Sequence, residues 1–308
     1  MFDIISKRYW YFLLSGLVII PGLIVMIYST IQFGTPVHLG IDFTGGALLE
    51  LQFEQPVQPA QVRQVFVDRG YTDTAVQTAA GERNVLIRSK PLDSATKVQI
   101  EAALEEKFGP LTELRFESVG PTIGREVTRA ALIAVAMASL TILGFIILAF
   151  RKVPNPFRYG VCAIAAMVHD VLVVVGLFSI FGLVFGWEVD ALFLTALLTV
   201  IGFSVQDTIV VFDRIRENIP KRRGEPFETI VNRSLLETLH RSLATQLNAI
   251  FVLIAILLFG GATIKQFVLV LLIGLFSGTY SSIFNAVPLL VVWENREIGR
   301  FLQHWTKL

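Results

Sequence analysis

The sequence has little of several features that would point to a common biochemical function. Its 308 residues include a single cysteine, Cys162, which excludes an intramolecular disulfide and a cysteine-rich metal site. The formal net charge is +1, so bulk charge does not suggest a nucleic-acid partner. The glycine-rich stretch 40–46 lacks the GxGxxG spacing of a phosphate-binding loop, and we therefore discount nucleotide binding.

Apolar sequence is what the chain has in excess. Hydrophobic residues make up 54% of it, and the mean hydropathy is +0.64, which is too apolar for an ordinary soluble domain. The first apolar run is longer than the core of a signal peptide and no small-x-small cleavage site follows it, so we interpret it as an uncleaved span. Six runs are long enough to cross a bilayer as helices, at approximately 9–30, 129–150, 159–182, 190–212, 244–263 and 266–293.

The placement of lysine and arginine predicts an orientation. Basic residues gather before the first run, between the second and third, between the fourth and fifth, and after the sixth. The positive-inside rule then places both termini and the loop 214–243 in the cytoplasm. The predicted organisation is a cytoplasmic N-terminus with the first span (1–32), an extracytoplasmic domain (33–125), a bundle of the other spans (126–295) and a cytoplasmic tail (296–308).

The polar insertion 33–125 has the pattern of a small folded domain. Strand and helix periodicities alternate along it in the order βαββαβ, the ferredoxin-like arrangement. Ser94 is the expected N-cap of its second helix, and a turn is expected around Ala80–Gly81. The fold class is thus a polytopic α-helical membrane protein with six transmembrane helices and an extracytoplasmic ferredoxin-like α+β domain between the first and second. The strands are predicted at 47–54, 74–78, 84–88 and 112–119, and the helices at 59–69 and 94–108.

Two glycine-rich stretches flank this domain. The first, GIDFTGG, precedes the first strand, and its paired glycines suggest a tight turn. The second, VGPTIGREV, follows the last strand and leads into the second span. Both are interpreted as joints between the domain and the membrane, formed by Gly40, Asp42, Gly45 and Gly46 and by Gly120, Pro121 and Gly124.

Two acidic residues inside apolar runs are the strongest functional signal. Asp170 lies near the middle of the third run, where insertion of a carboxylate costs about 2.5–3.5 kcal/mol, so it should face the bundle interior or a wet cavity. Asp207 lies late in the next run. Two buried acids on neighbouring spans suggest a proton or ion path, whereas the alternative is a carboxylate satisfied by a nearby hydroxyl or arginine. The adjacent His169 is expected to be structural.

Further polar and small residues lie near these acids or in the last span. Ser204, Asp207 and Arg214 share one helix face and could line a cytoplasmic-side pathway. Asp207 and Arg214 are about 10 Å apart along the helix, too far for a direct pair. Gly274 and Gly278 in the last span are predicted to allow close helix packing, and Asn285 is another candidate polar partner. The segment 226–240 is interpreted either as an amphipathic helix on the membrane surface or as a connecting helix packed on the bundle.

The motifs together resemble a known family. Five motifs are similar to those of SecF proteins. They are GIDFTGG at 40–46, VGPTIGREV at 119–127, the His169–Asp170 pair, IGFSVQDTIVVFDRIREN at 201–218 and LHRSLATQ at 239–246. SecF proteins are the smaller subunits of SecDF protein-export complexes, in the RND superfamily. The resemblance implies a multi-pass protein of a prokaryotic inner membrane. It also implies a SecD partner with six spans of its own, contact with the SecYEG channel, and translocating unfolded polypeptides.

The resemblance also implies a mechanism. In this family the aspartate matching Asp170 is implicated in proton conduction with the help of an arginine, for which Arg214 is our choice. The energy source would be the proton gradient, with sodium as an alternative coupled ion, and neither a cofactor nor an enzymatic activity is expected. Two other functions stay open: a small-molecule or lipid exporter of the RND type, and an intramembrane aspartyl protease using Asp170 and Asp207. The protease is disfavoured because neither acid lies in a Gly-x-Gly-Asp motif.

Overall fold

The computed structural model describes residues 3–78, 83–151, 153, 155–261, 264–295 and 297. The chain divides into two compact units. The small unit is Leu39–Leu132, and the helical unit combines Met1–His38 with Ile133–Leu308. The turn predicted at Ala80–Gly81 and the predicted tail 296–308, except for Glu297, lie outside the described residues.

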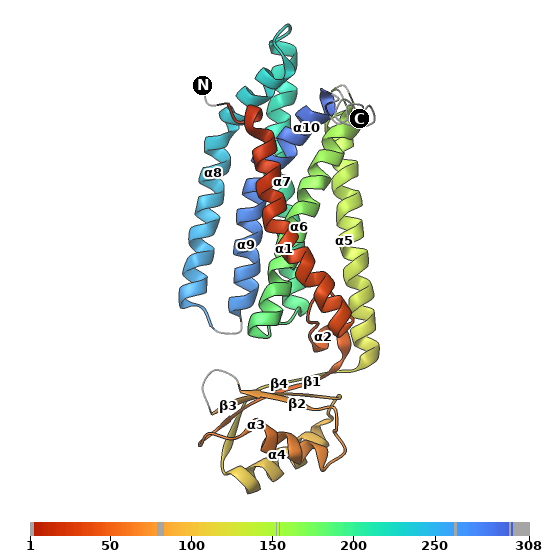
Figure 1. Ribbon diagram of the computed structural model, residues 1–308, viewed down its shortest axis with the longest axis vertical. Helices are drawn as coiled ribbons and strands as arrows, with labels where there is room; N and C mark the ends of the chain where they lie inside the picture. The colour runs from red at the N-terminus through yellow and green to blue at the C-terminus, as the bar shows by residue number, and fades with distance from the viewer. Residues whose placement is uncertain are drawn as a thin grey trace, which may run out of the picture. The chain divides into compact units, whose positions relative to one another are not determined.

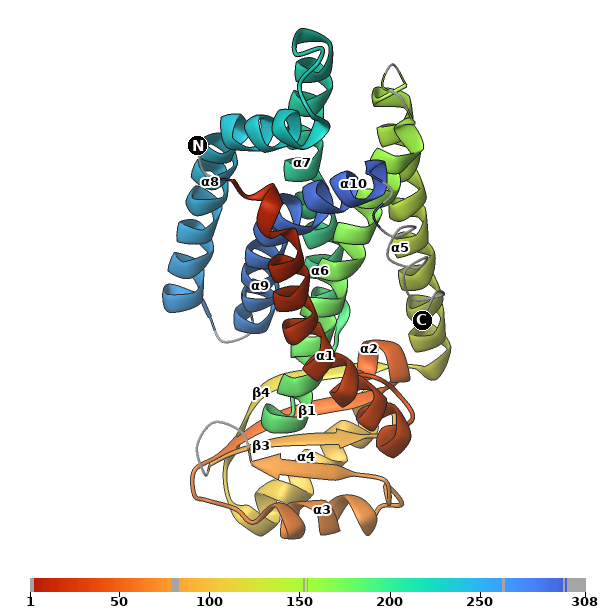
Figure 2. The ribbon, with the colours of Figure 1, turned by 45° about the horizontal axis from the view of Figure 1, so that its top comes forward.

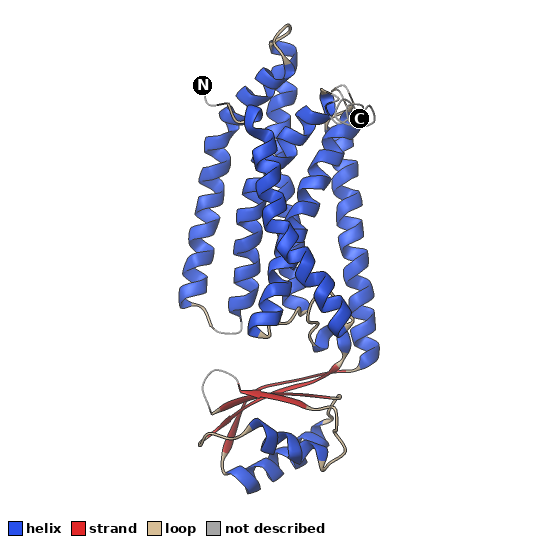
Figure 3. Ribbon diagram, viewed as in Figure 1, coloured by secondary structure: helices blue, strands red, loops and turns tan. Residues whose placement is uncertain are grey.

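The small unit has the predicted ferredoxin-like order. Its four strands form an antiparallel sheet in the order β2-β3-β1-β4, and its two longer helices lie together on one face of that sheet (Figure 3). Strands β1 and β2 run parallel with β3 between them, which is the split βαβ arrangement of this fold. The elements are β1 (Gly46–Phe53), α3 (Pro59–Val67), β2 (Ala75–Thr78), β3 (Asn84–Ser89), α4 (Ser94–Phe108) and β4 (Leu111–Val119).

Alternation along β1 explains the core of the small unit. Its even-numbered side chains point away from the helices, whereas Leu49, Leu51 and Phe53 pack against α3 and α4 and are almost fully buried. Burial of each such side chain contributes about 1.5–3 kcal/mol. The predicted N-cap of α4 is wrong by one residue. Asp93, not Ser94, caps the helix, because its Oδ1 accepts a hydrogen bond of 3.0 Å from the amide of Thr96.

The two glycine-rich stretches meet within the small unit. The stretch 40–46 begins with one helical turn, α2 (Ile41–Thr44), and the paired glycines then turn the chain into β1 as predicted, with φ of +73° at Gly45 and +132° at Gly46. A Cβ on Gly45 would lie 2.8 Å from Cα of Pro121, the first residue of α5 (Pro121–Ala149), and a Cβ on Gly124 would lie 2.7 Å from the carbonyl oxygen of Phe43. The backbones of α2 and of the first turn of α5 therefore touch, and only glycine permits this approach.

The helical unit contains the rest of the chain, and the prediction of six spans is confirmed. Among the described residues, six helical stretches are long and apolar enough to cross a membrane. They are α1 (Arg8–Phe33), preceded by the short helix η1 (Ile5–Lys7), then α5, α6 (Pro156–Phe185), α7 (Ala191–Lys221), α8 (Phe227–Phe259), and α9 (Lys265–Ser281), which continues through a π-helical turn (Ser282–Ala286) into α10 (Val287–Glu294).

Three of these helices form the centre of the unit. Helices α6, α7 and α9 pack against one another and are the most buried spans. They also expose fewer large apolar side chains than the other spans do. Helix α1 lies along α6, and α8 lies along α7 and α9 (Figures 1 and 2). The outer helices α1, α5 and α8 expose large apolar side chains, as expected for surfaces that face lipid.

The predicted loop 214–243 is mostly helical. Helix α7 continues to Lys221 and α8 begins at Phe227, so only five residues, 222–226, lie between them. No glycine or proline interrupts 227–259, and one helix therefore runs through both the predicted segment 226–240 and the fifth span. Val231 and Leu235 are fully buried in the bundle core. This supports a connecting helix packed on the bundle and leaves these side chains no access to a membrane surface.

The close approach at Gly45 gives a test of the joint. We expect Gly45→Ala to lower the free energy of unfolding of the small unit by roughly 2–5 kcal/mol, because a Cβ adds a backbone clash to the strain of positive φ. Gly70→Ala is the matched control, since Gly70 has φ of +87° but no atom within 4 Å of its Cβ position. It should cost only about 1–2 kcal/mol. Hydrogen exchange of buried amides in β1 and β4 measures the free energy of unfolding of both variants. An equal loss of stability in the two would contradict the contact between Gly45 and Pro121.

Candidate functional site

Asp170 lies at the centre of the helical unit, where three spans meet. Its side chain on α6 is 1% exposed. Three serine hydroxyls donate to it: Ser204 of α7 to Oδ2 at 2.5 Å, Ser281 of α9 to Oδ2 at 2.6 Å, and Ser277 of α9 to Oδ1 at 2.6 Å. The carboxylate thus joins α6 to both α7 and α9.

The neighbouring histidine completes the set of contacts. Nδ1 of His169 lies 3.0 Å from Oδ1 of Asp170. An ionised carboxylate offers about four acceptor positions, and a proton on Nδ1 would fill the fourth. The contact becomes an ion pair only when the imidazole is protonated on both nitrogens. His169 is therefore part of the site, although the sequence analysis gave it only a structural role.

Small residues on α9 allow this site to form. Ser277 and Ser281 are four residues apart and share one face of α9, with Gly274 and Gly278 beside them. A Cβ on Gly278 would lie 3.2 Å from Cα of Ser204 and 3.7 Å from Oδ2 of Asp170, and a Cβ on Gly274 would lie 2.0 Å from Cγ2 of Val200. Both glycines thus let α9 approach α7 closely enough for its serines to reach Asp170. Ser277 is a site residue that is not among those predicted from the sequence, although its four-residue spacing from Ser281 is a usable signal.

Asp207 occupies a separate place. It is 5% exposed, and its Oδ2 accepts a hydrogen bond of 2.7 Å from Nε2 of Gln246 on α8. Ser204, one turn earlier on α7, bonds to Asp170 instead. In the described part of the chain the two carboxylates therefore have different partners and share no hydrogen bond. This differs from the pair of carboxylates with a common proton that an aspartyl protease requires.

Arg214 does not reach either buried acid. Its Nε donates to Glu237 at 2.5 Å and its Nη1 to Glu217 at 2.8 Å, and its side chain is 38% exposed. Glu237 also accepts from Asn218 at 3.0 Å. Arg214 thus belongs to a polar cluster that fastens the end of α7 to α8. Among the described residues, no hydrogen bond or ion pair joins Arg214 to Asp170.

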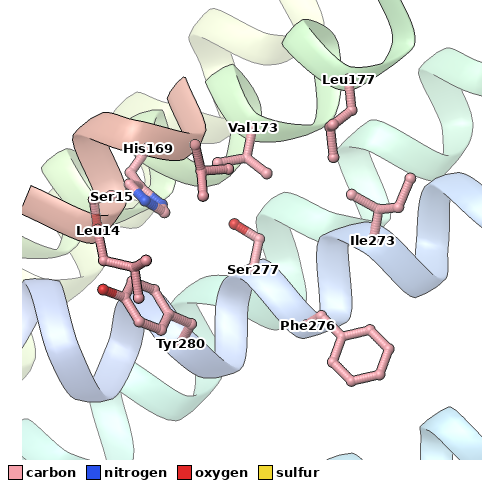
Figure 4. Close-up of a pocket in the computed structure, with 10 residues that line it drawn as sticks. Leu14, Ser15, His169, Val173, Leu177, Ile273, Phe276, Ser277 and Tyr280 are labelled. Carbon is pink, nitrogen blue, oxygen red and sulfur yellow. The ribbon is translucent and has the colours of Figure 1, made fainter. Parts of the chain in front are cut away.

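A cavity of about 370 Å³ lies beside the site, between α1, α6 and α9 (Figure 4). Its wall is mainly apolar, with Ser15, His169, Ser277 and Tyr280 as its polar side chains. Ser15 donates to Oδ1 of Asn285 at 3.0 Å, so the candidate polar partner Asn285 pairs with α1 rather than with Asp170. Ser277 and His169 therefore each contact both the cavity and the Asp170 carboxylate.

Fold and site together define a class of protein: a multi-pass membrane subunit with a ferredoxin-like domain between its first two spans and a hydrogen-bonded carboxylate inside its bundle. Two family models match the chain. One, described as protein export membrane protein SecD/SecF, C-terminal, matches residues 99–296, and the SecD/SecF GG motif matches residues 31–57. The second range contains Gly45 and Gly46, the second of which is the first residue of β1.

Individual proteins agree with the family models. The protein translocase subunit SecF of Thermobaculum terrenum is 54% identical over 98% of this chain and 97% of its own length. That of Anaerolinea thermophila is 52% identical over 100% of this chain and 99% of its own. The crystal structure of SecDF from Thermus thermophilus, a translocon-associated membrane protein, is 32% identical with a TM-score of 0.78, over 96% of this chain but only 39% of that longer chain. The present chain belongs to the SecD/SecF family of protein-export membrane proteins.

The contact between α7 and α9 can be tested by a pair of substitutions. We expect Gly274→Ala to destabilise the helical unit by about 1–3 kcal/mol, because the new methyl group would overlap Val200. Val200→Ala should remove the two closest contacts, with Cγ2 at 2.0 Å and Cγ1 at 2.6 Å, and leave Cβ at 2.8 Å, so the double variant should be more stable than the sum of the single effects predicts. Gly144→Ala in α5 is the control, since its Cβ position has no neighbour within 4 Å. Additive effects in thermal unfolding of the purified protein would contradict the contact.

Proposed function

We propose that this chain is the SecF subunit of a SecDF-type complex, in which Asp170 takes up and releases protons and so couples the proton motive force to protein export. The family comparisons support the export function. The observation that carries the coupling role is the position of Asp170, fully buried and bonded to α7 and α9 at once. An ionisable side chain inside a membrane bundle is a functional group by default.

The geometry suggests how protonation acts on the bundle. When Asp170 is ionised, its oxygens accept hydrogen bonds from α7 and α9, and hydrogen bonds to a charged group are worth about 1.5–3 kcal/mol each. A proton on the carboxyl removes the charge and weakens these bonds. Serine hydroxyls can rotate to donate or accept, so both states keep their partners. The proton therefore shifts the balance between two arrangements of α6, α7 and α9.

A SecD-type partner completes this proposal. The SecDF relatives from Bacillus subtilis and Thermus thermophilus are single chains of which the present chain matches 39%. The remainder of such a complex would come from a separate SecD subunit, and the pair would act at a SecYEG channel on unfolded polypeptides. The outward-facing apolar side chains of α5, such as Leu132 and Leu148, leave surface for lipid or for a partner's spans.

Asp170→Asn tests the coupling role. The asparagine keeps the size of the side chain but cannot ionise, so we expect normal abundance and loss of the stimulation of export by a proton gradient. Asp170→Glu should retain part of the stimulation, because it keeps a titratable group displaced by one methylene. Export into membrane vesicles, measured with imposed proton or sodium gradients, separates the two coupled ions. Full stimulation in the asparagine variant would show that Asp170 is structural.

The proposed orientation has its own test. The distribution of basic residues places the small unit outside and the α7–α8 connection in the cytoplasm. Cysteines introduced at the exposed positions Thr72 and Arg223 should therefore react with an impermeant thiol reagent from opposite sides of the membrane. The native Cys162 is fully buried and serves as an internal control that should stay unlabelled. Labelling of both positions from one side would refute the orientation.

A further inference from the structure

The two ring nitrogens of His169 differ in their hydrogen bonding. Its Nδ1 contacts Asp170, whereas its Nε2 is buried without a hydrogen-bond partner. Of the four polar side chains that line the α1–α6–α9 cavity, His169 is the one with a buried, unpaired polar atom among the described residues. Ser15 donates to Asn285, Ser277 to Asp170, and Tyr280 to the carbonyl oxygen of Tyr11 at 2.7 Å. A buried polar atom left without a partner in a membrane protein is costly, and here it belongs to a ring that also contacts the buried carboxylate.

The ring both lines the cavity and contacts the carboxylate. Figure 4 shows it on the cavity wall beside Ser15 and opposite Ser277. The aromatic ring of Tyr280 lies at 27° to it, with the ring centroids 6.1 Å apart. The titratable groups beside the imidazole are the Asp170 carboxyl on its own helix and the Tyr280 phenol on α9, while α1 presents the uncharged Ser15.

We propose that His169 carries protons between this cavity and Asp170. This inference rests on the proposed function of Asp170. The starting state is a neutral imidazole with its proton on Nδ1, donated to the ionised carboxylate. A proton from the cavity binds Nε2, and the Nδ1 proton then moves to Oδ1. The products are a neutral carboxyl and a neutral imidazole protonated on Nε2, and no electrons are exchanged.

The contact geometry suits both end states. Before transfer, Nδ1–H donates to the carboxylate across the 3.0 Å contact, and after transfer the carboxyl O–H donates to the bare Nδ1 across the same contact. His169 is thus a positioning and relay residue whose unpaired Nε2 is the entry point for the proton.

The experiment measures proton uptake by the reconstituted complex with its SecD-type partner in liposomes that contain a pH-sensitive dye. His169→Asn keeps a donor near the position of Nδ1 but cannot pass a proton on, and it should slow uptake by roughly 100-fold. His38→Asn is the matched control, because His38 also has a buried, unpaired Nε2 but no hydrogen bond or ion pair to a carboxylate in the described structure. It should leave uptake unchanged. His169→Gln serves as a second variant.

Chemical rescue distinguishes a relay from a packing role. In His169→Ala, added imidazole should restore uptake, whereas pyrazole, which has the same shape but is a much weaker base, should not. Equal rescue by both compounds, normal uptake in His169→Asn, or loss of the assembled complex in both the asparagine and glutamine variants would overturn the role of His169. Normal uptake in Asp170→Asn would instead overturn the proposed function itself, so the two failures are distinguishable.

Discussion

The helical unit depends on one requirement: the carboxylate of Asp170 must be satisfied inside an apolar bundle. Leaving such a group without partners would cost several kcal/mol, so α7 and α9 must bring hydroxyls to it. The hydroxyls of α9 reach it because Gly274 and Gly278 let α9 lie against α7. The same device recurs where α1 meets α6, since a Cβ on Gly22 would lie 2.7 Å from Cα of Gly176. The hydrogen bonds to Asp170 and the close helix packing at glycines thus depend on each other.

This arrangement favours discrete changes over gradual ones. Helices whose backbones touch have little freedom to bend past each other, and closely packed interfaces tend to switch between distinct packings. A change of charge at Asp170 acts on two neighbouring helices at the same moment, through Ser204 on one side and Ser277 and Ser281 on the other. In a SecD/SecF protein, such a switch would link proton movement to the mechanical work of export.

The sequence predicted most of the fold because its signals are local. Long apolar runs, alternation in β1 and the glycines that end helices identify the spans and the βαββαβ order directly. The errors arose where tertiary contacts decide. The loop predicted at 214–243 is mostly helical because the apolar face of α8 that includes Val231 and Leu235 is buried in the bundle. In the site, the burial of Asp170 followed from its depth, but its partners Ser277 and Ser281 come from more than 100 residues away and could not be paired with it from spacing alone.

The most direct test of the account is the protonation state of Asp170 itself. Infrared difference spectroscopy of the reconstituted complex, recorded while the pH is stepped across the membrane, detects the carbonyl stretch of a protonated carboxyl. We predict a band that appears and disappears with the pH step in the wild-type protein and is absent in Asp170→Asn. A band that persists unchanged in that variant, or no titrating carboxyl in the wild-type protein, would contradict the claim that Asp170 exchanges protons.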